Sequence, residues 1–262
     1  MKAIDNVYAA RKKNRPTSFA FIQSLFSDFV ELHGDRRFGD DKAVIGGIAD
    51  LDGMPVTVIA LEKGTDTKSR VARNFGSAHP EGYRKALRLM KQAEKFHRPV
   101  ICFVDTSGAY CGIGAEERGQ GEAIAENLME MMALKTPVLS ILIGEGGSGG
   151  ALALAVADEV WMLEKAVYSV ISPEGCASIM YKDSKMADVA AENLKLTAQD
   201  LYQLGVIERI LPEAEGENMA AIKRAVTEKI NSLCRIDPVT LCYKRYQRFR
   251  RIGAEEIQEG IS

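Results

Sequence analysis

A glycine-rich stretch near the middle of the chain leaves few choices for the local backbone. Gly144-Glu145-Gly146-Gly147-Ser148-Gly149-Gly150 carries five glycines in seven residues. The apolar run 138–143 before it follows Pro137 and is too short for a helix, so it predicts a buried strand. Residues 151–157 after it are small or apolar and favour a helix that is buried on most sides. A strand, a glycine loop and a helix in this order leave the first N–H groups of the helix unpaired, which predicts an anion-binding loop.

Three functional patterns fit this loop. The dinucleotide fingerprint G-x-G-x-x-G starts at Gly144, but this fingerprint usually follows the first strand of its domain, and here other predicted strands precede it. The nucleophile elbow G-x-S-x-G is centred on Ser148, but His33, His79 and His97 all precede that serine, which does not match the usual hydrolase order. The third pattern is an oxyanion hole made of paired N–H groups. A turn required only for close packing of helix on strand is the purely structural alternative.

Length, charge and cysteine content narrow the class of protein. A chain of 262 residues suits a single domain over 1–262, either one large α/β domain or one with helical additions. Its formal net charge of −2 argues against bulk nucleic-acid binding. The five cysteines form no C-x-x-C pair, which argues against a cysteine metal site and indicates a reducing compartment. We find neither a secretion signal nor an apolar run of about 18 residues, so we expect a cytoplasmic protein that does not span a membrane.

The first half of the chain predicts an arm, a helix and a hairpin. Residues 1–17 are polar and basic and suggest a solvated arm, and apolar spacing then predicts a helix from Thr17 or Ser18 to about Gly34. The runs 43–49 and 54–61, joined through Asp-Gly, predict an antiparallel hairpin that starts the sheet.

The segment 62–82 has little periodicity but is rich in cations. Lys63, Arg70 and Arg73 on a loop that leaves a strand could hold the phosphates of a ligand such as coenzyme A, and a solvated loop explains them equally well.

A repeat follows this segment. A helix is predicted from Pro80 to Phe96, and then strand, glycine-containing loop and helix occur twice, at 100–134 and at 138–157. Such repeats predict parallel strands with right-handed crossovers. Further strands are predicted at 159–163, 167–171 and 205–211, small helices between 172 and 204 with Thr197 as a cap, and two charged helices within 217–252 that pack on the domain.

A family resemblance rests on four motifs that occur in a fixed order: Phe75-Gly76 with 80–86, then 112–120, 144–151 and 169–177. The chain resembles the carboxyltransferase alpha subunit of bacterial acetyl-coenzyme A carboxylase over roughly residues 15–252. The resemblance implies a crotonase-like α/β fold of stacked ββα units with helical N- and C-terminal additions. It also implies an α2β2 assembly with a zinc-ribbon beta subunit, alongside a biotin carboxyl carrier protein and biotin carboxylase in an ATP-dependent holoenzyme.

The implied reaction moves a carboxyl group from carboxybiotin on the carrier protein to acetyl-CoA and gives malonyl-CoA for fatty acid synthesis. An enolate and a ureido oxygen both develop negative charge, and each is stabilised by preorganised N–H donors. By resemblance, Gly149 and Gly150 form an oxyanion hole, and Phe75, Gly76 and Ser77 offer further donors. Ser148 is then a small loop residue rather than a nucleophile. The carboxybiotin side is expected at Gly108, Ala109, Tyr110, Gly112, Ile113 and Gly114, the CoA phosphates at Lys63, Arg70 and Arg73, and zinc only in the beta subunit.

Departures from the family pattern keep other functions open. Ser107 and Cys111 stand where the family usually has prolines, so the biotin-side loop is expected to be more flexible. A stand-alone acyl-CoA hydratase or isomerase would use a carboxylate such as Glu116, Glu117 or Glu145. A non-catalytic scaffold for the beta subunit and, more distantly, a dinucleotide-dependent oxidoreductase are the remaining alternatives.

Overall fold

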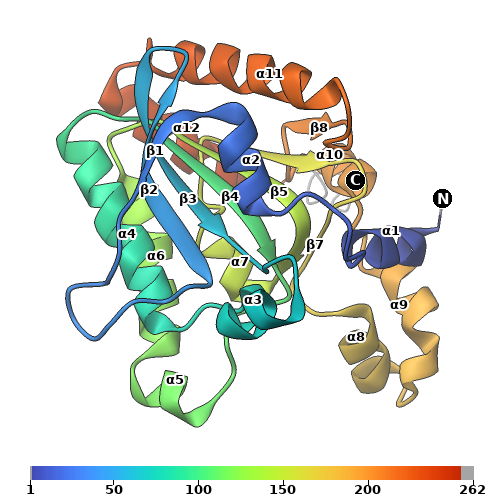
Figure 1. Cartoon of the computed structure of the whole chain (residues 1–262). Coiled ribbons are helices and arrows are strands. Elements are labelled where there is room, and N and C mark those ends of the chain that lie inside the picture. The colour runs from blue at the N-terminus through green and yellow to red at the C-terminus, as the bar shows by residue number, and fades with distance from the viewer. Residues whose placement is uncertain (1, 255–262) are drawn as a thin grey trace.

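One mixed sheet organises the computed structural model, which describes residues 2–254 (Figure 1). Its strand order is β1-β2-β3-β4-β5-β6-β8, and β7 also pairs with β5. The first three strands are antiparallel and the remaining pairs are parallel, which confirms both the predicted hairpin and the parallel repeat. The strands are β1 (Ser27–Glu31), β2 (Val44–Leu51), β3 (Met54–Leu61), β4 (Val100–Thr106), β5 (Val138–Gly147), β6 (Glu159–Leu163), β7 (Val167–Ser169) and β8 (Arg209–Leu211).

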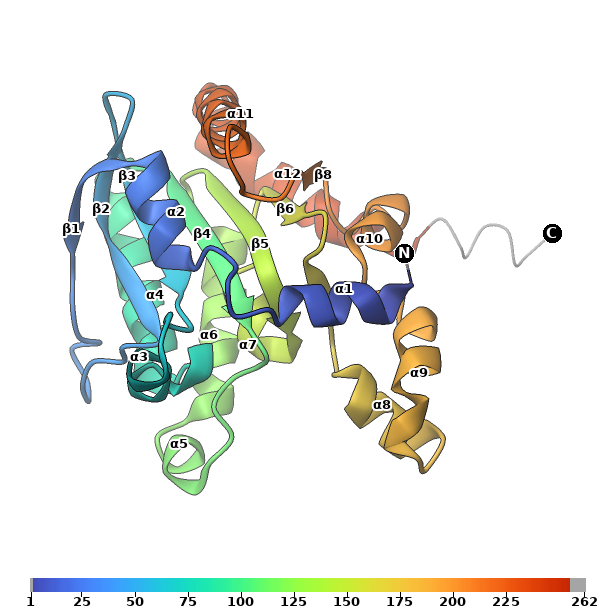
Figure 2. The same ribbon diagram turned by 45° about the vertical axis from the view of Figure 1, so that its right-hand side comes forward.

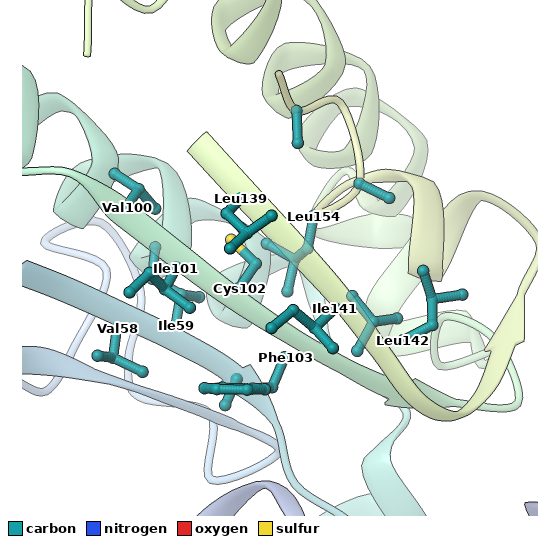
Figure 3. Packing of buried hydrophobic residues seen from close by; sticks show 14 of the residues in the cluster. Val58, Ile59, Val100, Ile101, Cys102, Phe103, Leu139, Ile141, Leu142 and Leu154 are labelled. Carbon is teal, nitrogen blue, oxygen red and sulfur yellow. The ribbon is translucent and has the colours of Figure 1, made fainter. Parts of the chain in front are cut away.

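Helices cover both faces of the sheet because its central strands are apolar on both faces. Adjacent residues of a strand point to opposite faces. The ring of Phe103 in β4 lies 5.4 Å from that of Phe21 in α2 (Ser18–Leu25), whereas Gly46 in β2 approaches Leu89 in α4 (Pro80–Lys95) on the other face. The helix α6 (Gln120–Ala133) packs beside α4. Figure 3 shows the apolar side chains of β3, β4 and β5 that fill this core.

The N-terminal region differs from the expected arm and single helix. Residues 3–10 form α1 (Ala3–Ala10), whose apolar residues Ile4 and Val7 are buried against Val167 and Leu196. The basic residues that suggested a solvated arm lie after this helix. The predicted helix to Gly34 is also wrong, because α2 ends at Leu25 and β1 then pairs with β2. The open edge of the hairpin accepts this strand, and a local helical pattern carries no information about such an edge.

Several other helices and strands have bounds that differ from the predicted ones. The helix predicted to complete the first repeat, 100–134, is interrupted at Gly119, whose φ of 80° separates α5 (Ile113–Glu117) from α6. The predicted helix 151–157 is instead α7 (Ser148–Leu152), although residues 153–157 are buried as expected. The segment 62–82 contains α3 (Thr67–Ala72) and the 3-10 turn η1 (Asn74–Gly76). The strands expected at 167–171 and 205–211 are shortened to β7 and β8.

The C-terminal part consists of short helices and two long ones. Thr197 caps α10 as predicted, since its hydroxyl accepts the N–H of Asp200 at 3.2 Å. Among residues 2–254, no helix is long and apolar enough to cross a bilayer. The helices are α8 (Pro173–Met180), η2 (Ser184–Met186), α9 (Ala187–Asn193), α10 (Ala198–Gln203), α11 (Asn218–Leu233) and α12 (Pro238–Arg251).

Candidate functional site

The glycine-rich loop lies at the carboxyl ends of the parallel strands. β5 continues to Gly147, and α7 begins at the next residue, Ser148, whose φ of 51° is left-handed. A Cβ atom on Gly147 would collide with the backbone of Ser107, and one on Gly150 with the backbone of Gly108 and Ala109. Glycine at these two positions therefore lets the loops that follow β4 and β5 touch.

Packing does not explain why residue 149 of this turn is a glycine. A Cβ atom on Gly149 would make only an ordinary contact, 3.5 Å from the side chain of Ile124. The first N–H groups of a helix have no partner within it, and Gly147 as N-cap has no side chain to satisfy them. The N–H groups of Gly149 and Gly150 fall in this first turn, so they are able to act as paired donors to a negative oxygen.

The loop from Ser107 to Gly112 is anchored by neighbours on one side. The Tyr110 N–H donates to the Ala78 carbonyl at 3.0 Å, and the Tyr110 ring stacks on His79 at 4.1 Å. The buried amide of Gln120 donates to the carbonyls of Ala78 and Tyr110 at 2.8 and 2.9 Å. These contacts hold the middle of the loop between Ser107 and Gly112.

Beyond this anchor the expected biotin-side residues reach into solvent. Cys111 is exposed, and the side chain of Ile113 is 81% exposed. Gly112 and Gly114 flank Ile113 at the start of α5. This helix lies past the ends of the strands, away from the body of the sheet (Figures 1 and 2). Ala109 instead packs against the main core.

The Phe75-Gly76-Ser77 segment lies beside the same strand end but differs from its expected role. The Gly76 N–H donates to the Arg73 carbonyl and the Ser77 N–H to the Asn74 carbonyl, both at 2.9 Å. These two amides are therefore already used within their own turn. Phe75 has a left-handed φ of 55° and is 56% exposed as a residue.

A chain of ion pairs joins the segments around the loop. The ammonium of Lys63 lies 2.7 Å from Asp105 and 2.9 Å from Glu145. The guanidinium of Arg11 lies 2.8 Å from Glu145 and 2.6 Å from Glu174. The Glu145 N–H also donates to the Asp105 carboxylate at 2.9 Å. This network links the ends of β3, β4, β5 and α1 with the start of α8.

The network also sets the ionisation of its members. Burial would lower the pKa of Lys63, but the carboxylates of Asp105 and Glu145 outweigh burial and raise that pKa. Burial would raise the pKa of Glu145, but Lys63 and Arg11 outweigh it and hold that pKa below its ordinary value. Both groups are thus charged near neutral pH. The sequence indicates Lys63 only as a phosphate ligand or as part of a solvated loop and does not indicate Arg11 and Asp105, because these residues meet only in the folded chain.

The three residues expected to bind phosphate therefore do not form one site in the structure. Lys63 is neutralised by two carboxylates, and Arg73 donates to the Lys42 carbonyl at 2.6 Å. Arg70 lines a cleft of about 230 Å³ that also includes Lys63, Phe75 and the basic segment after α1.

A smaller cleft of about 70 Å³ contains Gly146, Gly147 and Ser148. The two clefts share Arg11, Ser107 and Glu145 in their walls, so they meet at the carboxyl ends of β4 and β5.

The alternative chemistries find less support in this geometry. No histidine of the described residues lines the smaller cleft, which contains Ser148. Glu116 and Glu117 are exposed on α5 and line neither cleft, and Glu145 is held as a carboxylate by two cations. Residues 2–254 contain no group of three or more His, Cys, Asp or Glu side chains that could hold a metal ion.

Comparison with known proteins identifies the relatives of this chain. A family model described as acetyl co-enzyme A carboxylase carboxyltransferase-like matches residues 1–253. The acetyl-coenzyme A carboxylase carboxyl transferase subunit alpha of Ruminiclostridium cellulolyticum is 62% identical over 256 residues, which cover 97% of this chain and 98% of that protein. The protein of the same name from Clostridium perfringens is 58% identical over 257 residues and 95% of each chain.

Solved structures show the same fold at low sequence identity. Transcarboxylase 12S with methylmalonyl-coenzyme A and methylmalonic acid bound matches with a TM-score of 0.69 and 17% identity, over 87% of this chain and 44% of that one. A Pseudomonas malonate decarboxylase hetero-tetramer in complex with coenzyme A matches with a TM-score of 0.67 and 18% identity, over 85% of this chain and 91% of that one. The α/β fold with a parallel-rich sheet is thus the crotonase-like fold that the resemblance implied. With the family model and these relatives in agreement, the chain belongs to the alpha-subunit family of acetyl-coenzyme A carboxylase carboxyltransferases.

Proposed function

We propose that this chain is the alpha half of a two-subunit carboxyltransferase that moves the carboxyl group of carboxybiotin to acetyl-CoA. The observation that carries the proposal is the contact between two backbone loops, 107–109 and 147–150, at the carboxyl ends of β4 and β5. The first turn of α7 presents N–H groups there without side chains in the way. Such donors suit a reaction in which charge develops on oxygen.

The donor set fits a biotin or thioester oxygen better than a cation, since backbone N–H groups bind anions. Carboxybiotin, when bound, supplies the carboxyl group and then a site that takes up the methyl proton. Gly149 and Gly150 would stabilise the oxygen that becomes negative, and the segment from Gly108 to Gly114 would line the biotin side. The ion-pair network of Lys63, Asp105 and Glu145 would hold both loops in place.

The rest of the assembly follows from the same proposal. A beta subunit with a structural zinc would supply the second oxyanion hole and complete an α2β2 enzyme, and the biotin carboxyl carrier protein would deliver the carboxyl group from biotin carboxylase. Arg70 would remain a CoA phosphate ligand. The names of the relatives, which are alpha subunits, support a partner chain.

Carboxyl exchange tests the proposal. Carboxyl transfer from malonyl-CoA to free biocytin is measured with the chain alone and after mixing with the beta subunit of the same cell. We expect activity only in the mixture, because the second oxyanion hole lies on the other subunit. Hydration of an unsaturated acyl-CoA by the chain alone would support a stand-alone hydratase instead, and a stable complex without exchange would support a scaffold.

A glycine substitution tests the role of the loop within that complex. Gly150→Ala would place a methyl group against the backbone of Gly108 and Ala109 and displace the donors. We expect exchange to fall by about 10² to 10³, the usual cost of losing one oxyanion donor. Gly121→Ala is the matched control, because a Cβ atom there meets nothing within 4 Å. A Gly150→Ala complex that assembles and exchanges at the normal rate would contradict an oxyanion role.

A further inference from the structure

A further cavity, the arginine pocket, lies between α4, α6 and the loop that connects β1 to β2. The two helices lie side by side on one face of the sheet (Figure 1). The pocket has a volume of about 420 Å³, which is in the usual range of small-molecule sites. It shares no lining residue with the two clefts beside the glycine loop, so it is a separate site. Its basic residues are Arg36, Arg37, Arg84, Arg88 and Lys91.

Three acidic residues also line the arginine pocket, and each already has a cationic partner. Arg36 and Arg88 are left over, because their hydrogen bonds go to backbone carbonyls and neither forms an ion pair among residues 2–254. The pocket therefore has an excess of positive charge at these two arginines. The existing pairs are Asp35 with Arg84 at 2.8 Å, Glu126 with Arg37 at 3.6 Å, and Glu130 with Lys91.

The guanidinium groups of Arg36 and Arg88 converge on one oxygen atom. Nη1 of Arg36 donates to the His33 carbonyl at 2.8 Å, and Nη2 of Arg88 donates to the same oxygen at 3.3 Å. Nε of Arg88 donates to the Gly34 carbonyl at 3.0 Å. A guanidinium has more N–H donors than these bonds use, so both side chains keep donors for a ligand.

This arrangement is unfavourable as long as no anion lies between the two arginines. Burial and the charge of Arg36 lower the pKa of Arg88, and the carboxylates of Asp40 and Asp35 oppose this shift only in part. Arg36 also has a left-handed φ of 68°, which a residue other than glycine adopts at a cost in free energy. Backbone strain and charge repulsion at the wall of a cavity indicate a site whose ligand compensates both arginines.

Two neighbouring guanidinium groups match a doubly charged oxyanion. Arginine forms paired N–H bonds with the oxygens of phosphates and carboxylates. A phosphate group carries close to two negative charges near neutral pH and presents three oxygens, so it is able to bind both arginines at once. A single carboxylate has one charge and would compensate only one of them. The side chain of Leu87 also lines the pocket and offers an apolar contact to the organic part of a phosphate ester.

We infer that Arg36 and Arg88 bind a phosphate group in the arginine pocket, at a site separate from the glycine loop. The three ion pairs of the pocket hold its walls, and the two remaining arginines provide the charge and the donors for the ligand. The inference does not depend on the carboxyl-transfer reaction. The phosphate group belongs either to a small phosphate ester or to free phosphate, and binding experiments distinguish these two sources.

Amide chemical shifts of the full chain localise the ligand without turnover. The chain is titrated at constant ionic strength with glycerol 3-phosphate, inorganic phosphate and sodium chloride. We expect saturable shifts at residues 34–37 and 84–91 with both phosphates and none with chloride, because only a phosphate bridges the two arginines. Tighter binding of glycerol 3-phosphate would identify a phosphate ester as the ligand, and tighter binding of inorganic phosphate would identify the free ion.

Arginine variants test the two ligand groups. Arg88→Gln should weaken the binding of the better phosphate ligand about 10- to 100-fold, because hydrogen bonds between charged groups contribute strongly to affinity. The matched control is Arg224→Gln, which makes the same substitution at an exposed arginine on α11, outside the pocket. The control should bind phosphate as the wild type does.

Arg36→Asn separates binding from a structural role, since asparagine tolerates the left-handed conformation of residue 36. This variant should also lose phosphate affinity. In phosphate-free buffer its midpoint of urea unfolding should stay unchanged or rise, because the substitution removes a repulsive charge. A lower midpoint together with normal phosphate binding would show that Arg36 only closes its own loop, and it would overturn the inference.

Other results would also refute a phosphate site in the arginine pocket. These are equal shifts with phosphate and chloride, no saturable shift at residues 34–37 and 84–91, or binding that Arg70→Gln abolishes and Arg88→Gln leaves intact. The last result would place the ion in the larger cleft, which contains Arg70. In the reconstituted complex, Arg88→Gln should leave the KM for malonyl-CoA unchanged, and a tenfold increase would make the pocket part of the substrate site instead.

Discussion

At the scale of single residues, Ser148 has an unusual backbone conformation at the centre of the candidate site. It is the first residue of α7, its φ is 51°, and it is exposed at the sharp change from strand to helix. A non-glycine residue in this region costs roughly 1–2 kcal/mol. The same geometry would serve a nucleophile elbow, so the role of the hydroxyl needs its own test.

Replacement of Ser148 separates the two roles. Ser148→Gly should keep most of the exchange activity and should raise the free energy of unfolding by up to about 1 kcal/mol, because glycine adopts this φ without strain. Exchange assays and urea unfolding of the same preparation measure both effects. A hydrolytic nucleophile would behave differently, since its removal costs on the order of 10⁶ in rate.

At the scale of elements, the ion-pair network joins the ends of three neighbouring strands of the sheet to α1. Lys63 follows β3, Asp105 lies in β4 and Glu145 in β5, and Arg11 brings in the end of α1. Breaking a partly buried pair leaves a charge uncompensated, which costs more than the pair contributes when intact. The positions of both backbone loops should therefore depend on the ionisation of this network.

The pKa shifts define the pH range of that dependence. Glu145 has a pKa lowered from 4.5, so its stabilisation is present above about pH 4.5 and is lost as the pH falls through the lower folded value. Lys63 has a pKa raised from 10.5, so its stabilisation is present below about pH 10.5 and is lost as the pH rises further. Hydrogen exchange of residues 105–110 and 144–150, corrected for intrinsic rates, should stay constant between these limits and should increase below the acid limit and above the alkaline limit.

A lysine variant provides the control for this effect. Lys63→Met should move the acid-side loss of protection to higher pH, because Glu145 then keeps only Arg11 as partner. Lys68→Met, on the exposed face of α3, should leave the profile unchanged. Identical profiles for Lys63→Met and the wild type would show that the network does not position the loops.

At the scale of the whole molecule, α12 is fixed to the core through a buried arginine. Arg245 is buried, and its guanidinium makes two hydrogen bonds to Asp158, at 2.9 and 2.8 Å. It also donates to the carbonyls of Met131, Leu134 and Thr136. The basic C-terminal sequence is thus partly structural, which the charged pattern predicted for residues 217–252 does not reveal.

Removal of this arginine should destabilise the entire domain. Arg245→Ala leaves a buried carboxylate without its partner and should lower the free energy of unfolding by about 3–5 kcal/mol. Arg250→Ala, an exposed arginine on the same helix, should change it by less than about 1 kcal/mol. Urea unfolding monitored by circular dichroism measures both, and equal effects would contradict an anchoring role for Arg245.

Local signals in the sequence were sufficient for the hairpin, the parallel repeat and the glycine turn. Asp-Gly between two apolar runs, glycines after each parallel strand and a threonine cap act over a few residues, and each was confirmed. The oxyanion role of Gly149 and Gly150 and the biotin-side segment remain predictions that the exchange assays test.

Tertiary structure decided what depends on residues distant in sequence. β1 formed because the hairpin offered an open edge, and α1 became a buried helix because Val167 and Leu196 cover its apolar face. Lys63 was an isolated cation in the sequence and became the centre of a network only when Asp105 and Glu145 reached it. The sequence by itself determined the backbone conformations that glycine and turn residues permit. Which charges neutralise one another and which remain available to a ligand depended on packing, since electrostatic pairing is set by distance in space.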